Sequence, residues 1–317
     1  MVALERRERK GPILTPSSLA CLGGIPTINI TEGCAHACSY CYTQGYSGYP
    51  GANRVVLFDN TAELVRAELA RKRRRPKRVY FSPSSDAFQP LPEVQDVTFD
   101  TMSDLYERGV EVGFLTKGSV SDRFLTLFAN RPDRVFAQVG ITTLAEGLMR
   151  ALEPRAASAA ERLRTIEGLT RAGVVTRARL DPLVPDLTDT EANLRPLLSA
   201  LSQRGVRSVA ASYLFLRPAF AWRTVKRLRD LTGWSHASEN WAWHRFADGV
   251  GRGKMIRPEV RRERFGRLRA LAAEHNIEVH LCACKNPDLD LASNCHIAGP
   301  PLVPVRHHTA PLFPEQQ

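Results

Sequence analysis

Three cysteines, Cys34, Cys38 and Cys41, stand in the stretch Thr31-Glu-Gly-Cys-Ala-His-Ala-Cys-Ser-Tyr-Cys-Tyr42. Three residues separate the first two thiols, two residues separate the last two, and Tyr40 directly precedes the third. Structural zinc sites and electron-transfer iron–sulfur clusters usually take four protein ligands. Three thiolates in one short loop therefore indicate a metal centre that keeps one position open for a ligand from outside the protein.

The spacing Cys-x3-Cys-x-aromatic-Cys resembles the signature of the radical S-adenosylmethionine (SAM) enzymes. The preceding residues 26–31 support the resemblance, because they have the pattern of a strand that leads into a loop. The resemblance implies that Cys34, Cys38 and Cys41 hold a [4Fe-4S] cluster whose fourth iron binds SAM. A zinc knuckle or inert buried thiols are the alternative interpretations.

That resemblance also implies an activity. We expect an enzyme that takes an electron from a reductant such as flavodoxin or ferredoxin and cleaves SAM reductively. The resulting 5′-deoxyadenosyl radical would abstract hydrogen from a substrate that the sequence does not identify.

Strand and helix patterns alternate along the chain, which predicts parallel βαβ units. Strands are expected at residues 26–31, 78–82, 111–116, 134–140, 174–180 and 206–211. Helices are expected at about 61–70, 94–108, 121–129, 158–171 and 189–203. These elements fit the open, partial (β/α)6 TIM-like barrel that the resemblance to radical SAM enzymes implies.

The predicted barrel occupies only part of the chain. We expect an N-terminal segment at 1–24, the partial barrel at 25–215, a C-terminal extension at 216–300 and a tail at 301–317. The extension should contain a basic helix at 258–275, a short strand at 277–281 and a second group of cysteines.

Several predicted strands end in polar residues, and in a parallel barrel the active site lies at these ends. Ser85 follows the second strand and Lys117 follows the third. Together with the cysteine loop, Glu153-Pro154 and Arg162, these segments resemble the spore photoproduct lyase branch of the superfamily over about residues 25–185. A DNA-repair lyase is therefore one alternative function.

The narrower resemblance implies roles for individual residues. Ser85 and Lys117 match residues that contact SAM, Tyr40 matches the aromatic residue beside the adenosyl group, and we place Arg162 with them as a cofactor-binding residue. Tyr42 matches a tyrosine implicated in returning a hydrogen atom, which makes it the catalytic candidate.

One position departs from that branch. Pro83 stands where the spore enzyme has the cysteine that returns hydrogen to its product, two residues before Ser85. Proline carries no S–H group, so we expect radical chemistry of this kind on a different substrate.

The second cysteine group comprises Cys282, Cys284 and Cys295. Three interpretations are open: a second iron–sulfur cluster, a zinc site, or inert thiols that pack the C-terminal strand. Thiols one residue apart on a strand point to opposite faces unless a turn intervenes. Cys21 stands alone in the sequence, and we expect it to be a small buried apolar residue.

Composition limits the remaining choices. The formal net charge of +11 is compatible with nucleic-acid binding, and a non-catalytic zinc protein associated with nucleic acid is a further alternative. Seven cysteines, clustered at the two ends, do not resemble an extracellular disulfide framework, so we expect a reducing cytoplasmic location. No apolar run reaches the roughly 18 residues of a membrane span.

Overall fold

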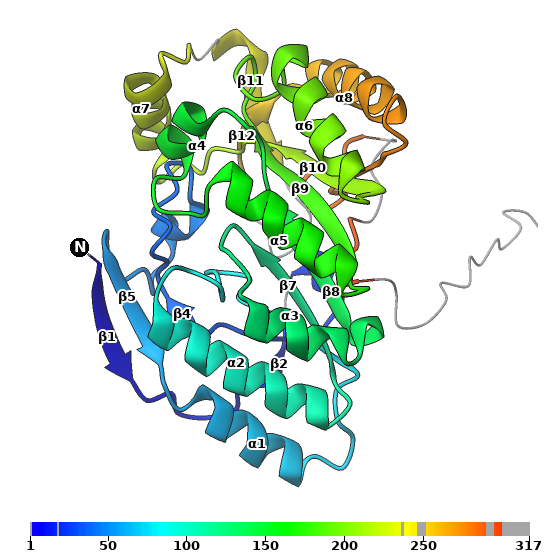
Figure 1. The fold of residues 1–317 in the computed structure, drawn as a ribbon. Coiled ribbons are helices and arrows are strands. Elements are labelled where there is room, and N and C mark those ends of the chain that lie inside the picture. The colour runs from blue at the N-terminus through cyan, green and yellow to red at the C-terminus, as the bar shows by residue number, and fades with distance from the viewer. Residues whose placement is uncertain (1, 18, 236–237, 246–251, 290–294, 300–317) are drawn as a thin grey trace, which may run out of the picture.

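The computed structural model describes residues 2–17, 19–235, 238–245, 252–289 and 295–299 (Figure 1). The expected tail at 301–317 lies outside these residues. The main sheet has eight strands in the order β13-β10-β9-β8-β7-β6-β3-β2. These are β2 (Thr15–Pro16), β3 (Pro26–Ile28), β6 (Arg78–Phe81), β7 (Glu111–Thr116), β8 (Val135–Gly140), β9 (Val175–Leu183), β10 (Ser208–Tyr213) and β13 (Glu278–Leu281).

The sheet is an open barrel, as expected. Neighbouring strands are parallel from β3 to β13, and only β2 pairs antiparallel with β3. The six expected strands form its consecutive centre. The two edge strands, β2 and β13, come from outside residues 25–215.

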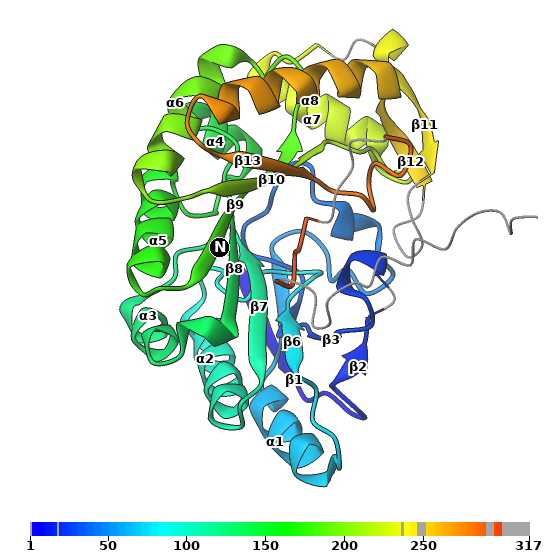
Figure 2. The ribbon, with the colours of Figure 1, turned by 90° about the vertical axis from the view of Figure 1, so that its right-hand side faces the viewer.

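Helices cover the outer side of the curved sheet (Figure 2). They are α1 (Thr61–Arg71), α2 (Pro92–Glu107), α3 (Asp122–Ala129), α4 (Glu146–Leu152), α5 (Ala159–Arg171), α6 (Glu191–Gln203), α7 (Ala221–Thr232) and α8 (Pro258–Ala273). Helix α5 packs on β8 and β9, and α8 packs on β13. All six residues of β8 are buried, which is typical of a parallel strand that is covered on both faces.

The start of α5 illustrates how the sequence sets these boundaries. The Ser158 hydroxyl accepts a hydrogen bond from the Glu161 amide at 3.2 Å, and the Glu161 carboxylate accepts one from the Ser158 amide at 2.7 Å. This capping box satisfies amide groups that the first turn leaves unpaired. The helix therefore begins at Ala159, which fixes the position of Arg162 one turn later.

Two smaller sheets were not predicted. Strands β1 (Ala3–Arg7), β5 (Arg54–Phe58) and β4 (Thr31–Glu32) form one of them, with β5 in the middle. Strands β11 (Trp241–Arg245) and β12 (Arg252–Ile256) pair antiparallel in the other. The sheet β1-β5-β4 matters for the site, because β4 leads directly into the cysteine loop.

Within the ranges given above, none of the helices combines the length and the apolar character that a membrane crossing requires.

Candidate active site

The cysteine loop leaves β4 through a turn that only glycine fits. Gly33 has φ of +78°, and a Cβ atom there would lie 2.5 Å from the Arg54 carbonyl oxygen and 2.7 Å from Pro50 Cγ. The Thr31 hydroxyl donates to the Gly33 carbonyl at 3.0 Å, and the Ala35 amide donates to Gln89 Oε1 at 2.7 Å. These contacts fix the backbone on both sides of Cys34.

The second half of the loop is held against α4. The Ser39 amide and hydroxyl both donate to the Leu152 carbonyl, at 2.8 and 3.0 Å. The Cys41 amide donates to the Cys38 carbonyl at 3.2 Å. As a result, Cys34, Cys38 and Cys41 line one open cavity, which is also lined by residues at the carboxyl ends of the strands.

Burial changes the pKa values of the loop thiols. It raises the pKa of Cys34 well above its usual value and that of Cys38 to about 12. A metal that binds here therefore has to displace the thiol protons.

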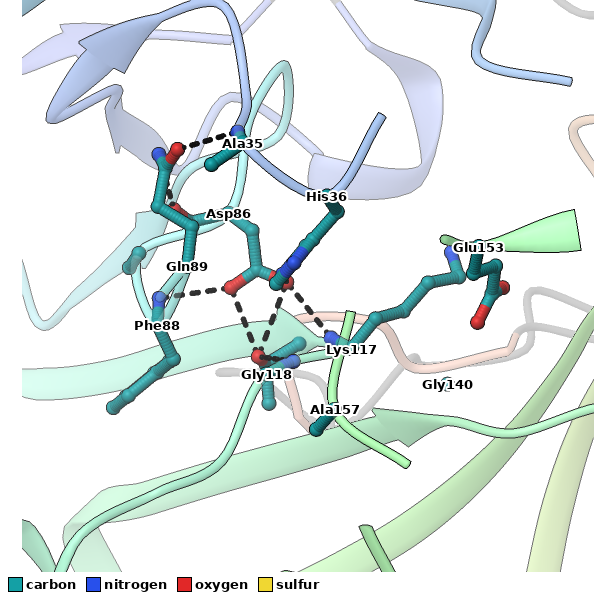
Figure 3. Close-up of polar contacts among 12 residues, drawn as sticks. Ala35, His36, Asp86, Phe88, Gln89, Lys117, Gly118, Gly140, Glu153 and Ala157 are labelled. Carbon is teal, nitrogen blue, oxygen red and sulfur yellow. Dashed lines mark hydrogen bonds and ion pairs between the residues drawn. The ribbon is translucent and has the colours of Figure 1, made fainter. Parts of the chain in front are cut away.

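Asp86 connects the cysteine loop to the barrel (Figure 3). Its carboxylate accepts hydrogen bonds from His36 Nε2 at 3.0 Å, the Thr116 hydroxyl at 2.8 Å, the Lys117 amide at 2.7 Å and the Phe88 amide at 2.8 Å. Burial alone would raise the pKa of Asp86, but the His36 imidazole and the two amides outweigh burial and lower it. An ionised Asp86 thus holds the loop against the ends of β6 and β7. This role of Asp86 was not predicted from the sequence.

A buried charge network lies beside Asp86. The Glu153 carboxylate accepts a hydrogen bond from the Tyr40 hydroxyl and forms an ion pair with Arg162. Burial alone would lower the pKa of Lys117, but the electrostatic attraction of Glu153, Cys38 and Asp181 together outweighs burial and raises the pKa. Burial alone would raise the pKa of Glu153, but Arg162 and Lys117 outweigh it and lower the pKa. Lys117 is thus an ammonium, and its Nζ lies 5.6 Å from the centre of the Tyr40 ring.

The Lys117 side chain can extend into the cavity because the residue that packs against it, Gly140, is a glycine. A Cβ atom at Gly140 would lie 3.0 Å from Lys117 Cγ, so a larger residue would press on the lysine stem. In Figure 3 the Lys117 side chain extends toward Glu153.

Four of the five predicted cofactor and catalytic residues line the cavity, namely Tyr40, Tyr42, Ser85 and Lys117. Arg162 does not belong to the cavity lining. It is fully buried behind Glu153, and it donates to the carbonyls of Gly140 at 2.8 Å and Ala157 at 2.9 Å. Arg162 thus contacts Glu153 and two backbone carbonyls, and its direct contact with a cofactor stays a prediction.

The cavity wall offers groups that fit SAM. In the described part of the chain, the buried hydroxyls of Ser82 and Ser85 have no hydrogen-bond partner. A buried polar group without a partner costs free energy unless a ligand supplies one. These hydroxyls and the Lys117 ammonium suit a ligand with amino and carboxylate groups, and the Tyr40 ring offers a flat apolar surface.

Tyr42 lies where a hydrogen donor could act. Its hydroxyl donates to the Pro83 carbonyl at 2.7 Å, and burial raises the pKa of Tyr42 well above its usual value. The phenol therefore keeps its hydrogen. Pro83 itself lines the cavity, so the position of the missing thiol does face the site.

The far wall of the cavity carries charge from β9 and beyond. Arg179 is 4% exposed and donates to Asp181 Oδ2 at 2.8 Å, while Lys285 Nζ lies 2.9 Å from both Asp181 oxygens. Arg217 lies 5.2 Å from the ring centre of Tyr46. Cationic and aromatic groups are thus combined at this end of the cavity.

Tyr213 ends β10 near the cavity, but its hydroxyl donates to Asp189 at 3.0 Å and its ring packs on Phe265. It is a core residue. Of the tryptophans in the C-terminal extension, Trp222 and Trp243 are exposed, and Trp234 and Trp241 are buried. These five aromatic side chains are not part of the cavity wall.

The second cysteine group borders the same cavity. Cys282, Cys284 and Cys295 line it, and Cys21 lies with them. Cys21 packs beside the apolar cluster of Leu22, Tyr80 and Ala298, in line with the expectation of a small buried apolar residue, but folding also brings it beside the second cysteine group. Among the described residues, no group of three or more His, Cys, Asp or Glu side chains has the arrangement found around a metal ion, either here or in the loop.

Comparison with known proteins agrees with this geometry. The model of the radical SAM superfamily matches residues 28–194, more than half of the chain. The chain therefore belongs to the radical SAM superfamily, and the cysteine loop, Ser85 and Lys117 all fall within the matched region.

Related sequences say less about the function of this chain than the family match does. An uncharacterized protein of Mycobacterium tuberculosis is 30% identical over 201 residues, which cover 60% of this chain and 59% of that protein. A radical SAM Nα-GlyT isomerase of Pseudomonas phage M6 is 27% identical over 201 residues, which cover 63% of this chain and 41% of the isomerase. The match thus spans less than two thirds of each relative's length.

Solved structures confirm the fold. A spore photoproduct lyase mutant with bound AdoMet and dinucleoside spore photoproduct has a TM-score of 0.69 and 16% identity, with 87% of this chain and 81% of that chain covered. The lyase complexed with dinucleoside spore photoproduct has a TM-score of 0.68 and 15% identity, with 88% and 82% covered. At this identity the likeness shows the fold alone.

Proposed function

We propose that this protein is an enzyme that cleaves SAM reductively and uses the radical so formed to abstract hydrogen from a substrate. The observation that carries the proposal is the cavity in which three loop thiols face Tyr40, Ser85 and Lys117. A [4Fe-4S] cluster on Cys34, Cys38 and Cys41 would supply the electron for SAM cleavage.

The chain's own residues have separable tasks in this proposal. Lys117, kept cationic by Glu153, binds the SAM carboxylate, and the unpartnered Ser85 hydroxyl binds a second polar group. The Tyr40 ring packs against the adenosyl group. Arg162 holds Glu153 in place, so it acts through Glu153 and Lys117 and does not contact SAM.

We propose that the substrate carries an aromatic base and an anionic group. Arg217 lies among Tyr42, Tyr46 and Phe215, at 5.8, 5.2 and 5.8 Å from their ring centres. Aromatic faces stack on bases and a guanidinium binds phosphate, so a nucleotide or nucleic acid suits this end of the cavity. The dinucleoside in the lyase structures and the net charge of +11 support this choice.

A DNA-repair lyase is the second candidate, supported by the fold shared with spore photoproduct lyase. Pro83 argues against it, because its carbonyl accepts the Tyr42 hydroxyl and no thiol is present at that position. If this chain does carry out such a reaction, Tyr42 would have to return the hydrogen atom.

We further propose a flavodoxin or ferredoxin as the reductant and the cytoplasm as the location, where the seven free thiols would stay reduced. We also propose that the second cysteine group, Cys282, Cys284 and Cys295, holds a second metal.

The function can be tested with anaerobically reconstituted protein. It should bind about four irons at the loop and release 5′-deoxyadenosine when SAM and dithionite are added. Cys38→Ala should abolish this release while the far-UV circular dichroism spectrum stays unchanged. Undiminished release from the folded variant would overturn the assignment, and a protein that takes up zinc but no iron would favour the non-catalytic alternative.

A further inference from the structure

Four thiols from three distant segments meet on one wall of the cavity. Cys21 lies in the short 3₁₀ helix η1 (Ala20–Leu22), Cys282 and Cys284 follow β13, and Cys295 belongs to the described segment 295–299. Cys282 and Cys295 pack together with Cys284 beside them, and Cys21 lines the same cavity. Thiol–thiol hydrogen bonds connect Cys21 to Cys284, Cys284 to Cys282 and Cys282 to Cys295. The four thiols thus form one continuous cluster.

A turn places two of these thiols on the same side. The Cys282 carbonyl accepts hydrogen bonds from the amides of Lys285 at 3.1 Å and Asn286 at 3.0 Å, and from Asn286 Nδ2 at 2.9 Å. Asn286 is fully buried, and its Oδ1 accepts from Arg261 at 2.7 Å. The chain therefore turns directly after β13, and Cys284 folds back toward Cys282 and does not continue the strand.

Cys295 is held from the barrel side. Its carbonyl accepts hydrogen bonds from Gln138 Nε2 at 3.1 Å and Arg177 Nη1 at 3.2 Å, and Arg179 Nη1 lies 3.7 Å from its sulfur. Gln138 is the polar exception in the buried strand β8, and this contact accounts for it. Three residues on β8 and β9 thus place this thiol in the cluster.

The surrounding charge suits deprotonated thiols. Arg177, Arg179 and Lys285 lie around the cluster, and Asp181 pairs with the last two. The three cations less one carboxylate leave two positive charges. Four thiolates around a divalent ion carry two negative charges, so the buried site and its surroundings would balance.

The cluster also joins the two edges of the open sheet. Cys21 lies between β2 and β3 at one edge, and Cys282 directly follows β13 at the other edge. Segment 295–299 lies on the inner side of the sheet (Figure 2), where a Cβ atom at Gly113 of β7 would lie 3.4 Å from Ala298 Cα. A metal bound here would connect the two edges across the gap that the strands leave open.

The close spacing favours a single ion. Zinc–sulfur bonds of about 2.3 Å in a tetrahedron place neighbouring sulfurs about 3.8 Å apart, which is within thiol–thiol contact. A cluster in which each thiolate binds a different iron needs wider spacing.

We propose that Cys21, Cys282, Cys284 and Cys295 form a four-thiolate site for one tetrahedral divalent ion, with Zn²⁺ as the natural occupant, and that this ion fastens the open barrel. The site is distinct from the SAM loop and does not depend on the reaction proposed above. Binding releases the remaining thiol protons and changes no oxidation state.

The test removes the loop cysteines by mutation and measures the metal bound at the four-thiolate site. A variant with Cys34, Cys38 and Cys41 all changed to Ser should be purified with about one zinc per chain, and Co²⁺ in its place should give the absorption spectrum of a tetrahedral thiolate complex. Adding Cys21→Ser should weaken zinc binding by more than the roughly 10–100-fold typical of residues outside the ligand shell. Zinc binding that Cys21→Ser leaves unchanged, or iron with sulfide in the triple variant, would overturn the proposal.

A second measurement uses the unaltered chain, in case the variants do not fold. Treating the protein with a strong zinc chelator should lower its melting temperature, and adding back Zn²⁺ should restore it. A thiol reagent should release one zinc per chain. A protein that contains no zinc when purified, and whose melting temperature Zn²⁺ does not change, would also overturn the proposal.

Discussion

The two cysteine groups of this protein share a cavity and differ in construction. The loop group draws three thiols from eight consecutive residues, and the backbone around Gly33, Asp86 and Leu152 holds it in place. The other group comprises Cys21, Cys282, Cys284 and Cys295, from three segments that come together only in the folded chain. Three protein ligands leave one coordination position open, as catalytic metal sites require. Four protein ligands close the coordination sphere, as in metal sites that stabilise a fold.

This difference predicts that the two groups can be separated by mutation, and the largest effect should come from the ligands themselves. Cys38→Ala should remove the loop iron and all 5′-deoxyadenosine release but leave zinc bound. Cys284→Ser should do the reverse: zinc is lost and the melting temperature falls, while loop iron stays. Iron and zinc would be counted per chain in both variants. Loss of both metals from either variant would mean that the groups are one site.

Arg162→Met tests the buried support of the loop site. It leaves Glu153 without its ion-pair partner in a fully buried position, which should destabilise the fold by about 3–5 kcal/mol. Urea unfolding would measure this change. Because Arg162 does not line the cavity, folded protein should still bind SAM, and a loss of SAM binding without a loss of stability would make Arg162 a direct contact.

Lys117→Met should weaken SAM binding by about 10–100-fold, since it removes a charge-assisted contact. Zinc content should not change, because Lys117 belongs to the loop side of the cavity. Isothermal titration with SAM would measure the effect, and Lys77→Met, on an exposed lysine, is the matched control. Equal affinities of the two variants would exclude Lys117 from the SAM site.

Gly33→Ala should have the smallest effect of the four. The left-handed backbone costs about 1–2 kcal/mol for a residue with a Cβ atom, and the contact with the Arg54 carbonyl adds strain. We expect less iron at the loop and unchanged zinc. Gly48→Ala is the control, because its Cβ would meet only Glu32 side-chain atoms at 3.6 Å or more. Equal iron loading in both variants would show that the turn at Gly33 is not required.

The sequence predicted the elements whose signals are local. Apolar runs gave the six central strands, and the segment at Ser158 gave the start of α5 because capping depends on neighbouring residues. The loop cysteines were identified from their spacing, and Tyr40, Ser85 and Lys117 from the resemblance to a known family together with position after strands. All of them line the cavity.

Features that depend on distant contacts were not predicted. Strand β1, Ala3-Leu-Glu-Arg-Arg7, has three charged residues and becomes a strand only by pairing with β5. In the sequence, Asp86 has the pattern of a turn residue. Its role depends on His36 and Lys117, which contact it only in the folded chain. Cys21 carries no local signal. The only hint was arithmetic, because three loop cysteines leave four of the seven for a second site.

The central claim is that the loop thiols hold a cluster to which SAM binds directly, and electron paramagnetic resonance of the reduced protein tests this most directly. The account predicts a [4Fe-4S]⁺ signal that changes when SAM is added, persists in Cys284→Ser and is absent from Cys38→Ala. A signal that SAM leaves unchanged, or one that survives Cys38→Ala, would contradict it.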